Sequence, residues 1–257
     1  MIHLIYNEDL DSKMPVTADD SKFTEDRDRL HLQMMSAVSH DLKTPLASII
    51  GSLEIHDKMK ESLSEDKRVT LLKTALEEAY RLDGFISNIL DMARIENGMT
   101  KVHRRHCEVD QIIQDCIQKV TNVQNKAEIS VIKPLFSTSV ETDSSLLSRS
   151  FQCLLDNAIK HSGNAKPKIQ ISFSEGDNEV IVHIKDDGVG IPAGDEEVIF
   201  SKYTRLAKKD YKNAGTGLGL TIARAISKLL GGGIYLEKSN TEGPYTGAAF
   251  AMKVPVV

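Results

Sequence analysis

Apolar side chains recur every three or four positions through the first part of the chain, a spacing typical of amphipathic helices. The first run of these positions is Leu30, Met34, Val38, Leu42, Pro45, Leu46, Ile49 and Leu53. After a polar stretch at residues 57–67 the spacing resumes at Val69, Leu72, Leu76, Ala79, Leu82, Ile86, Ile89 and Ala93. Asn97 and Gly98 follow, and glycine commonly ends a helix. The pattern predicts two long helices joined by a polar turn, a helical hairpin that forms a domain over residues 22–98.

A single hairpin of this kind exposes a wide apolar stripe that its own two helices cannot cover. Pairing of two copies in a four-helix bundle would bury the stripe, so the sequence predicts a homodimer. The alternative is that the hairpin packs against a second domain of its own chain.

The spacing of apolar residues changes after residue 98. Alternating runs predict β-strands at residues 168–174, 180–184, 234–237 and 248–254. Amphipathic segments predict helices at residues 109–120, 146–160 and 218–230. Together these elements predict an α/β sandwich over residues 99–257, in which helices pack on a sheet. Residues 1–21 carry no readable pattern and are predicted to be a tail or linker.

The composition fits a globular protein with one large domain or two modest ones. Of its 257 residues 40% are hydrophobic and 27% charged, and the formal net charge is -5. An acidic chain is poorly suited to the phosphate backbone, so no nucleic-acid partner is expected. The three cysteines match neither a disulfide framework nor a zinc site, which indicates a reducing, cytoplasmic setting. No apolar run approaches the roughly 18–20 residues of a spanning helix, so no membrane segment is expected in this chain.

A histidine with an acidic neighbour stands in the middle of the first predicted helix. His40 lies at the edge of the apolar stripe, Asp41 follows it, and Pro45 comes five residues after it. A proline inside a helix removes one backbone hydrogen bond and kinks the chain, which packing alone rarely favours. A neutral imidazole can attack phosphorus, and an adjacent carboxylate can orient the ring and hold its proton. Taken alone, however, a helical histidine is more often a surface or core residue.

Two polar residues lie near the end of the helix predicted at residues 146–160. Asn157 and Lys160 are three positions apart and therefore share one face of that helix. An amide oxygen suits a magnesium ion, and an ammonium group suits phosphate oxygens. In isolation, the same pair also fits a solvated helix face.

Two glycine-rich segments follow. Residues 186–192 read Asp-Asp-Gly-Val-Gly-Ile-Pro, and a buried carboxylate at Asp186 could accept a hydrogen bond from an adenine amine. Residues 215–220 read Gly-Thr-Gly-Leu-Gly-Leu and open the last predicted helix, where backbone amides form a cradle for an anion. Neither segment is specific alone, because Asp-Gly turns are common and the second segment lacks the Gly-Lys-Ser/Thr ending of a P-loop.

The order of these four motifs resembles that of the histidine box, the asparagine box and the two glycine boxes of two-component sensor histidine kinases. Residues 199–205, Ile-Phe-Ser-Lys-Tyr-Thr-Arg, are similar to the phenylalanine box of the same family. The likeness extends over about residues 22–257. It implies a HisKA-type dimeric four-helix bundle, followed by a Bergerat-type ATP-binding domain like that of gyrase, heat-shock protein 90 and mismatch-repair ATPases.

The resemblance implies that ATP phosphorylates His40 with Asp41 as the general base. The phosphoryl group would then pass to an aspartate on the receiver domain of a response regulator. Magnesium would be held by Asn157 and by phosphate oxygens, under a lid from about Tyr203 to Gly215. The residues that the resemblance assigns to nucleotide binding are Asn157, Lys160, His161, Asp186, Gly188, Gly190, Ile191, Tyr203, Arg205, Gly215, Thr216, Gly217, Leu218 and Gly219.

Thr44 lies four residues after His40 and therefore on the same face of the predicted helix. The Asp-x-x-Thr pattern that it completes is similar to the one that positions a hydrolytic water in kinases that also dephosphorylate their regulator. A second, phosphatase activity is therefore expected. The alternative is a hydroxyl that bonds back to its own helical turn.

Two positions depart from the family pattern. Cys153 stands where many members have a second asparagine, and a thiol is a poor ligand for magnesium. Asp187 stands where asparagine is usual and adds a charge beside the adenine pocket. Cys153 keeps one alternative function open, a dimeric signalling scaffold that binds ATP but transfers little. A gyrase-like ATPase that phosphorylates nothing is disfavoured by the histidine box.

Overall fold

The computed structural model describes residues 38–39, 41–59, 61–124, 127–202, 204, 217–237 and 244–256. The tail or linker expected at residues 1–21 lies outside these residues. The chain forms two compact units, Met1–Ala75 and Leu76–Val257, and the division between them falls within helix α2 (Glu65–Glu96). No helix in the described part of the chain is long and apolar enough to cross a bilayer.

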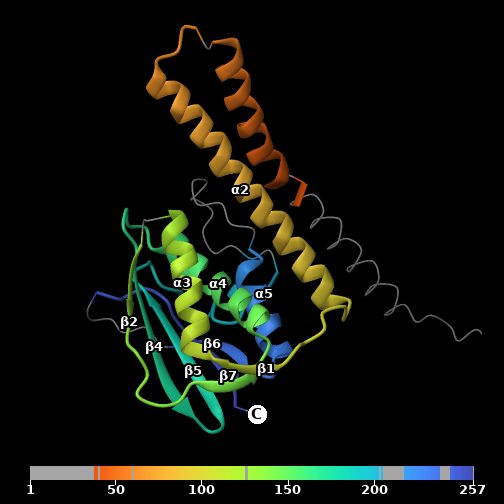
Figure 1. Cartoon of the computed structure of the whole chain (residues 1–257), viewed down its shortest axis with the longest axis vertical. Helices are drawn as coiled ribbons and strands as arrows, with labels where there is room; N and C mark the ends of the chain where they lie inside the picture. The colour runs from red at the N-terminus through yellow and green to blue at the C-terminus, as the bar shows by residue number, and fades with distance from the viewer. Residues whose placement is uncertain are drawn as a thin grey trace, which may run out of the picture. The chain divides into compact units, whose positions relative to one another are not determined.

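The first compact unit contains a helix over residues 41–58 and the beginning of α2, joined by a short turn before Glu65 (Figure 1). Both helices extend further into the polar stretch at residues 57–67 than the spacing of apolar residues predicts. Glu65 and Asp66 account for the early start of α2, because acidic side chains stabilise the first turn of a helix. An ion pair between Arg68 and Glu65, 2.6 Å long, joins the same turn.

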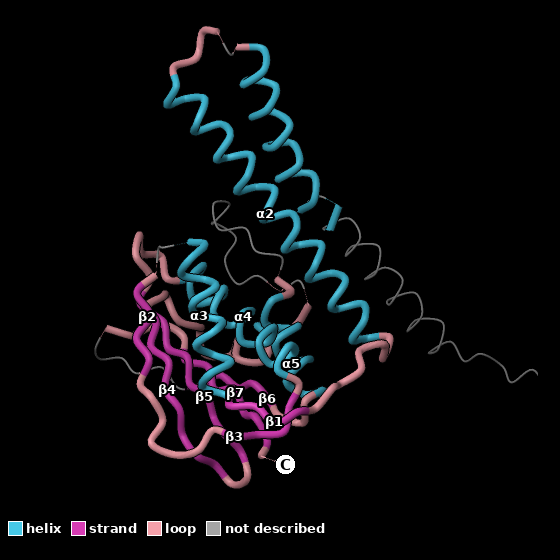
Figure 2. The backbone as a smooth tube through the Cα atoms, in the orientation of Figure 1, coloured by secondary structure: helices cyan, strands magenta, loops and turns pink. Residues whose placement is uncertain are grey.

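Five strands form the main sheet of the second unit, in the order β2-β4-β5-β7-β6. Their bounds are β2 (Glu128–Val131), β4 (Lys168–Gly176), β5 (Glu179–Asp186), β7 (Ala249–Pro255) and β6 (Gly233–Glu237). β2 pairs with β4 in parallel, and the other neighbours are antiparallel. Helices α3 (Val109–Gln124), α4 (Ser144–His161) and α5 (Gly219–Leu229) lie over one face of this sheet (Figure 2). Strands β1 (Arg105–Glu108) and β3 (Ser139–Thr142) form a separate two-stranded sheet.

The alternation of side chains along β5 shows how the covered face is built. Consecutive side chains of a strand point to opposite faces, and every second residue of β5 is buried. Val182 and Ile184 belong to the same hydrophobic core as Phe151 on α4 and Ile222 on α5. The next position in this buried row is Asp186, a carboxylate that is only 2% exposed. The buried side chains of β5 are therefore apolar except at the last position, where the carboxyl group of Asp186 is buried.

The strands and helices predicted for the second unit are all present, each within a few residues of its expected bounds. The hairpin's second helix ends before Gly98, as predicted, and Gly98 adopts a positive φ of 64°. Strands β1, β2 and β3 were not predicted. Each is four residues long, which is too short for alternation to distinguish a strand from a loop.

The N-terminus of α4 is fixed by the side chain of Asp143. Its Oδ1 accepts hydrogen bonds from the backbone N–H groups of Ser145 (3.0 Å) and Leu146 (3.1 Å), and its Oδ2 accepts one from His103 N–H (2.9 Å). Burial alone would raise the pKa of Asp143, but these three bonds and the nearby His103 outweigh it and lower the pKa. The cap therefore works best with an ionised carboxylate.

Replacement of Asp143 by alanine should lower the free energy of unfolding by about 1 kcal/mol at neutral pH, because two helix N–H groups lose their acceptor. The folded-state pKa is depressed, so the charge of Asp143 stabilises the protein above the ordinary aspartate range and ceases to do so as pH falls through the folded pKa. Urea unfolding at pH 7 and at a pH below the ordinary aspartate range would measure this difference. Asp143→Asn, which retains a capping oxygen, should lose less of the free energy of unfolding than Asp143→Ala. An equal loss in the two variants would contradict the capping role.

Candidate nucleotide-binding site

The C-terminal end of α4 presents the residues of the predicted asparagine box. Asn157 is half-buried, and no hydrogen bond within the described residues engages its side-chain amide. Lys160 and His161 are exposed in the last turn of α4, where basic side chains are stabilised by the helix dipole. This helix end therefore offers a neutral oxygen ligand beside positive charge.

The carboxylate of Asp186, at the end of β5, is held by the turn after β5 and by the residue directly before β7. Its Oδ1 accepts hydrogen bonds from the backbone N–H groups of Gly188 and Ala248, both 2.9 Å long. Burial raises the pKa of Asp186, these two bonds lower it, and the negative charge of Asp187 raises it further, so that the net shift is upward. Within the described residues no hydrogen bond reaches Oδ2. One oxygen of Asp186 is therefore fixed by the backbone, and the other is available to accept a donor from a ligand.

Two glycines make room for this carboxylate. A Cβ atom at Gly247 would lie 1.9 Å from Asp186 Oδ1 and 2.3 Å from the backbone nitrogen of Gly188. A Cβ atom at Gly188 would lie 2.4 Å from the carbonyl oxygen of His161, the last residue of α4. The turn after β5 therefore approaches both β7 and the end of α4 so closely that only glycine fits at these two positions. Gly190, in the same turn, adopts a positive φ of 71°.

The second glycine box begins α5 and packs against α4. Gly217 has a positive φ of 65°, Leu218 is fully buried, and Gly219 is the first residue of the helix. A Cβ atom at Gly219 would lie 3.9 Å from the carbonyl oxygen of Cys153, an ordinary contact distance. The first turn of α5, with its backbone N–H groups, therefore lies beside the helix that carries Asn157.

Cys153 belongs to the hydrophobic core and is 5% exposed. Burial raises the pKa of its thiol to about 11, although the positive charge of Arg149 acts in the opposite direction. The thiol is therefore neutral at physiological pH, and a neutral thiol is a poor ligand for magnesium.

The beginning of the phenylalanine box is anchored on α5. The short helix η1 (Val198–Phe200) buries Ile199 and Phe200, and Thr221 Oγ1 donates a hydrogen bond of 2.9 Å to the Phe200 carbonyl. Arg224 donates to both carboxylate oxygens of Glu197, at 2.6 and 3.2 Å, and its guanidinium lies 4.5 Å from the centre of the Phe200 ring. These contacts fix the segment that leads into the predicted lid.

The second compact unit thus brings together most of the residues assigned to nucleotide binding. Asn157, Lys160 and His161 end α4, Asp186 and Gly188 meet that end, Ile191 packs against the core, and Gly217, Leu218 and Gly219 begin α5. Five predicted site residues, His40, Tyr203, Arg205, Gly215 and Thr216, lie outside the described residues. Asp41 and Thr44 belong to the other compact unit.

The sequence did not reveal the part that β7 plays in this site. Gly247 and Ala248 hold Asp186 from the far side, although they lie about sixty residues later in the chain. A glycine directly before the last predicted strand was the only available signal. A glycine at this position indicates a close approach to Asp186 only once β7 is known to pair with β5.

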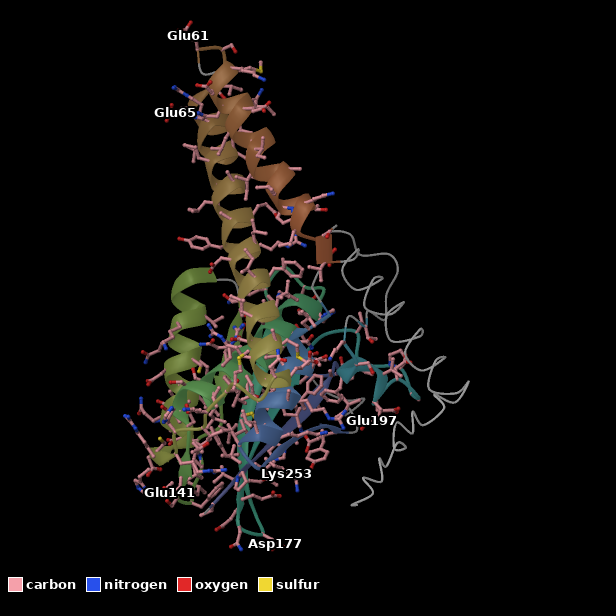
Figure 3. All side chains as sticks on the ribbon, turned by 90° about the vertical axis from the view of Figure 1, so that its right-hand side faces the viewer. Glu61, Glu65, Glu141, Asp177, Glu197 and Lys253 are labelled. Atoms are coloured by element: carbon pink, nitrogen blue, oxygen red, sulfur yellow. The ribbon has the colours of Figure 1, made fainter. Side chains whose placement is uncertain are left out.

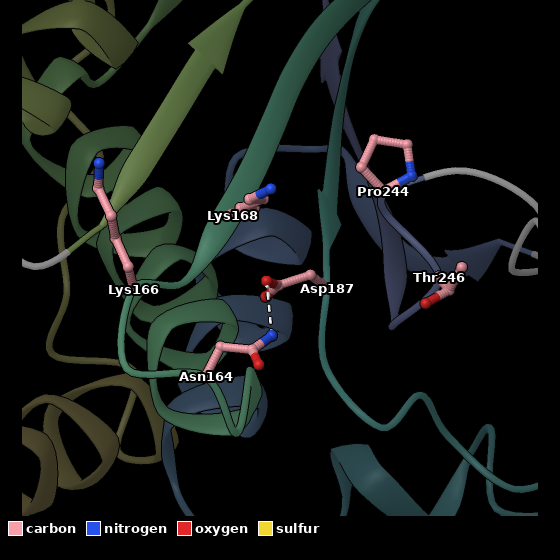
Figure 4. Close-up of a pocket in the computed structure, with 6 residues that line it drawn as sticks. All are labelled: Asn164, Lys166, Lys168, Asp187, Pro244 and Thr246. Carbon is pink, nitrogen blue, oxygen red and sulfur yellow. Dashed lines mark hydrogen bonds between the residues drawn. The ribbon is translucent and has the colours of Figure 1, made fainter.

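A cavity of about 450 Å³ lies beside the turn after β5, and Asp187 faces it (Figure 4). Its lining consists of Asn164, Lys166, Lys168, Asp187, Pro244 and Thr246. Asn164 Nδ2 donates a hydrogen bond of 2.8 Å to Asp187 Oδ2. The side chain of Asp187 is therefore engaged with the loop after α4, whereas Asp186 is engaged with β7.

Two family models match the chain in the order that the motifs predict. The His Kinase A (phospho-acceptor) domain matches residues 30–98. The histidine kinase-, DNA gyrase B- and HSP90-like ATPase matches residues 142–257. Together the matches include all four motifs, and the chain has the catalytic core of a two-component histidine kinase.

Curated relatives agree with this family, and a solved structure has the same fold. Sensor protein KdpD of Escherichia coli (strain K12) is 29% identical over 246 residues, which are 94% of this chain and 26% of the relative. Sensor histidine kinase RppB of Synechocystis sp. is 27% identical over 227 residues, 87% of this chain and 49% of the relative. The chain thus spans about a quarter to a half of these relatives' lengths. The structure of the Acinetobacter baumannii histidine kinase AdeS has the same fold, with a TM-score of 0.58 at 22% identity over 84% of this chain and 98% of that one.

Gly247→Ala should weaken ATP binding at least tenfold, a loss of about 1.4 kcal/mol, because the new Cβ atom would displace Asp186 or the start of β7. Titration calorimetry with ATP and magnesium would measure the dissociation constant. Gly84→Ala is a matched control, since a Cβ atom at that helical position meets nothing within 4 Å. Wild-type affinity in Gly247→Ala would show that Asp186 does not contact the nucleotide.

Proposed function

We propose that this protein is an ATP-dependent histidine kinase that phosphorylates its own His40 and transfers the phosphoryl group to an aspartate of a response regulator receiver domain, in the cytoplasm. The observation that carries the nucleotide assignment is Asp186, a buried carboxylate with one oxygen fixed by the backbone and the other without a partner among the described residues. The histidine box supplies the acceptor, and the two family matches support the pairing of acceptor and ATP-binding domain.

The side chains around Asp186 fit the parts of a bound nucleotide. Asp186 Oδ2 accepts a hydrogen bond from the exocyclic amine of adenine. Lys160 and the first N–H groups of α5 meet the phosphates, whose negative charge they neutralise. Asn157 would hold a magnesium ion through its amide oxygen, and magnesium would supply charge neutralisation of the transferring phosphoryl group. Tyr203, Arg205, Gly215 and Thr216 remain assigned by resemblance.

The proposed reaction forms one bond and breaks another at the γ-phosphorus. A ring nitrogen of His40 attacks in line, the bond to the β,γ-bridging oxygen breaks, and ADP leaves. Asp41, which is adjacent to His40 in sequence and half-buried in its helix, orients the imidazole and accepts the proton that the ring loses. Positioning and charge neutralisation supply most of the catalysis in reactions of this class.

A homodimer is part of the proposal because the hairpin keeps many apolar side chains exposed. Leu46, Ile50, Leu53, Val69, Leu72, Leu76 and Ile86 are 44% to 55% exposed. A second copy of the hairpin offers the same stripe, and mutual burial of such side chains in a four-helix bundle stabilises a dimer.

His40→Gln should retain ATP binding and lose all self-labelling with γ-labelled ATP, because glutamine cannot form the phosphoramidate. The label on the unmodified protein should be acid-labile and stable to alkali. His56→Gln, which leaves His40 and the residues assigned to nucleotide binding in place, should still accept label. Labelling that persists in His40→Gln would move the acceptor elsewhere, and an unmodified protein that binds ATP but never labels would favour the scaffold.

Regulator dephosphorylation is proposed to depend on Thr44, which is exposed three residues after Asp41 on its helix. Thr44→Ala should leave autophosphorylation within a few-fold of normal, while the lifetime of the regulator phosphate lengthens more than tenfold. A factor of ten is about 1.4 kcal/mol, within what one positioned hydrogen bond contributes. Phosphatase and labelling assays with the same protein would separate the outcomes. Equal loss of both activities would indicate a packing role, and unchanged dephosphorylation would remove the assignment.

A further inference from the structure

Asp187 and Asp186 are adjacent in sequence but engage different partners. Asp186 is the last residue of β5 and ends its buried row beneath the helices, and Asp187 is the first residue of the turn that follows. Asp187 faces the cavity that it shares with Lys168, at the start of β4, and with Thr246 (Figure 4). A direct contact of this carboxylate with adenine is therefore not part of the site.

The chain after α4 is folded so that an amide meets Asp187. Gly163 adopts a positive φ of 72° directly after the α4 C-cap residue Ser162, which turns the chain sharply. The buried Ser162 Oγ accepts a hydrogen bond from Asn164 N–H at 3.2 Å. This turn presents Asn164 Nδ2 to Asp187 Oδ2 at 2.8 Å.

The carboxylate is ionised where it receives this bond. Burial opposes the charge, but Ser162, Asn164 and the backbone N–H of Lys168 outweigh it and lower the pKa of Asp187. The distance and angles between the Asn164 amide and Asp187 are those of a hydrogen bond. A hydrogen bond to an ionised acceptor is stronger than one between neutral groups.

The bond joins the two elements that carry the nucleotide-binding residues. Asn164 belongs to the loop that ends α4, the helix of Asn157 and Lys160, whereas Asp187 is the neighbour of Asp186. The same two elements also touch where Gly188 approaches the His161 carbonyl. The Gly188–His161 contact limits how closely the two elements approach, and the Asp187–Asn164 bond is a second link between them.

We propose that Asp187 is a positioning residue which, through Asn164, fixes the spacing between the adenine-binding carboxylate of Asp186 and the phosphate-binding end of α4. The inference rests on the proposed nucleotide site. A nucleotide binds tightly only if its adenine and its phosphates meet their partners together. Loss of the bond therefore weakens binding of the nucleotide and leaves the transfer step at saturation nearly unchanged.

The test compares Asp187→Ala, Asn164→Ala, the double variant and Asp187→Asn. Calorimetry gives the dissociation constant of magnesium-ATP, and self-labelling gives KM and kcat. Each alanine variant should bind about fivefold more weakly or worse, the size expected for loss of one charge-assisted hydrogen bond, with kcat within about twofold of normal. Asp187→Asn retains an acceptor for Asn164 and should restore most of the affinity. The double variant should bind no more weakly than the weaker single variant, because both changes remove the same bond.

Asp177→Ala is the matched control, since Asp177 is an exposed carboxylate in the turn between β4 and β5, at the far end of the same hairpin (Figure 3). Thermal unfolding of every variant separates lost affinity from lost folding, and Asn164→Ala carries the test if Asp187→Ala does not fold. Wild-type affinity in both single variants, or additive losses in the double variant, would overturn the proposal. A fall in kcat at unchanged KM would also overturn it. An unmodified protein that binds no ATP would instead refute the proposed function.

Discussion

The structure of the nucleotide site depends on a carboxylate that is buried at the end of an apolar row. Asp186 is only 2% exposed, and burial of a charge-bearing group is costly unless hydrogen bonds compensate it. Two backbone N–H groups from different segments, Gly188 and Ala248, supply that compensation. For both to reach the same oxygen, β7 and the turn after β5 must converge on it, and this convergence excludes a side chain at Gly247. The two hydrogen bonds to Asp186 Oδ1 thus fix the local backbone, and Oδ2 is left to accept a hydrogen bond from a ligand.

Helix α4 connects the fixed backbone around Asp186 to the other residues of the site. Its N-terminus is fixed by the cap at Asp143, its middle belongs to the core through Phe151 and Leu154, and its last carbonyl lies against Gly188. With both ends and the middle held, the helix has little freedom to move along its axis. Asn157 and Lys160 are therefore presented by a rigid element, although both are polar and only partly covered. Placement of partly exposed binding groups on a fixed helix provides preorganisation without burying them.

Sequence reasoning located the parts of the site that lie within one motif. The turn after β5 and the polar end of α4 each require particular residue types at short spacing, and such requirements are visible in the sequence alone. The role of Gly247 was missed because glycine is required there only by the pairing of β5 with β7. This pairing is a long-range relation that no local pattern encodes. The partner of Asp187 was equally hidden, because it depends on how the loop after α4 brings Asn164 to the end of β5. Cys153 could be recognised as unusual, but only its burial in the core shows that its thiol stays neutral.

The described residues that are proposed to bind nucleotide all lie in the unit Leu76–Val257, whereas Asp41 and Thr44 lie in the unit Met1–Ala75. Under the proposed function, ATP binding is therefore a property of one unit, and phosphorylation of His40 requires both. Under that function, a preorganised site need not restrict signalling. A rigid frame around Asp186 and α4 would set how strongly the nucleotide is held, and the rate of transfer would depend on how often His40 and the nucleotide meet. A stimulus that changes only the encounter of the two units can alter phosphorylation without disturbing the buried carboxylate on which nucleotide binding depends.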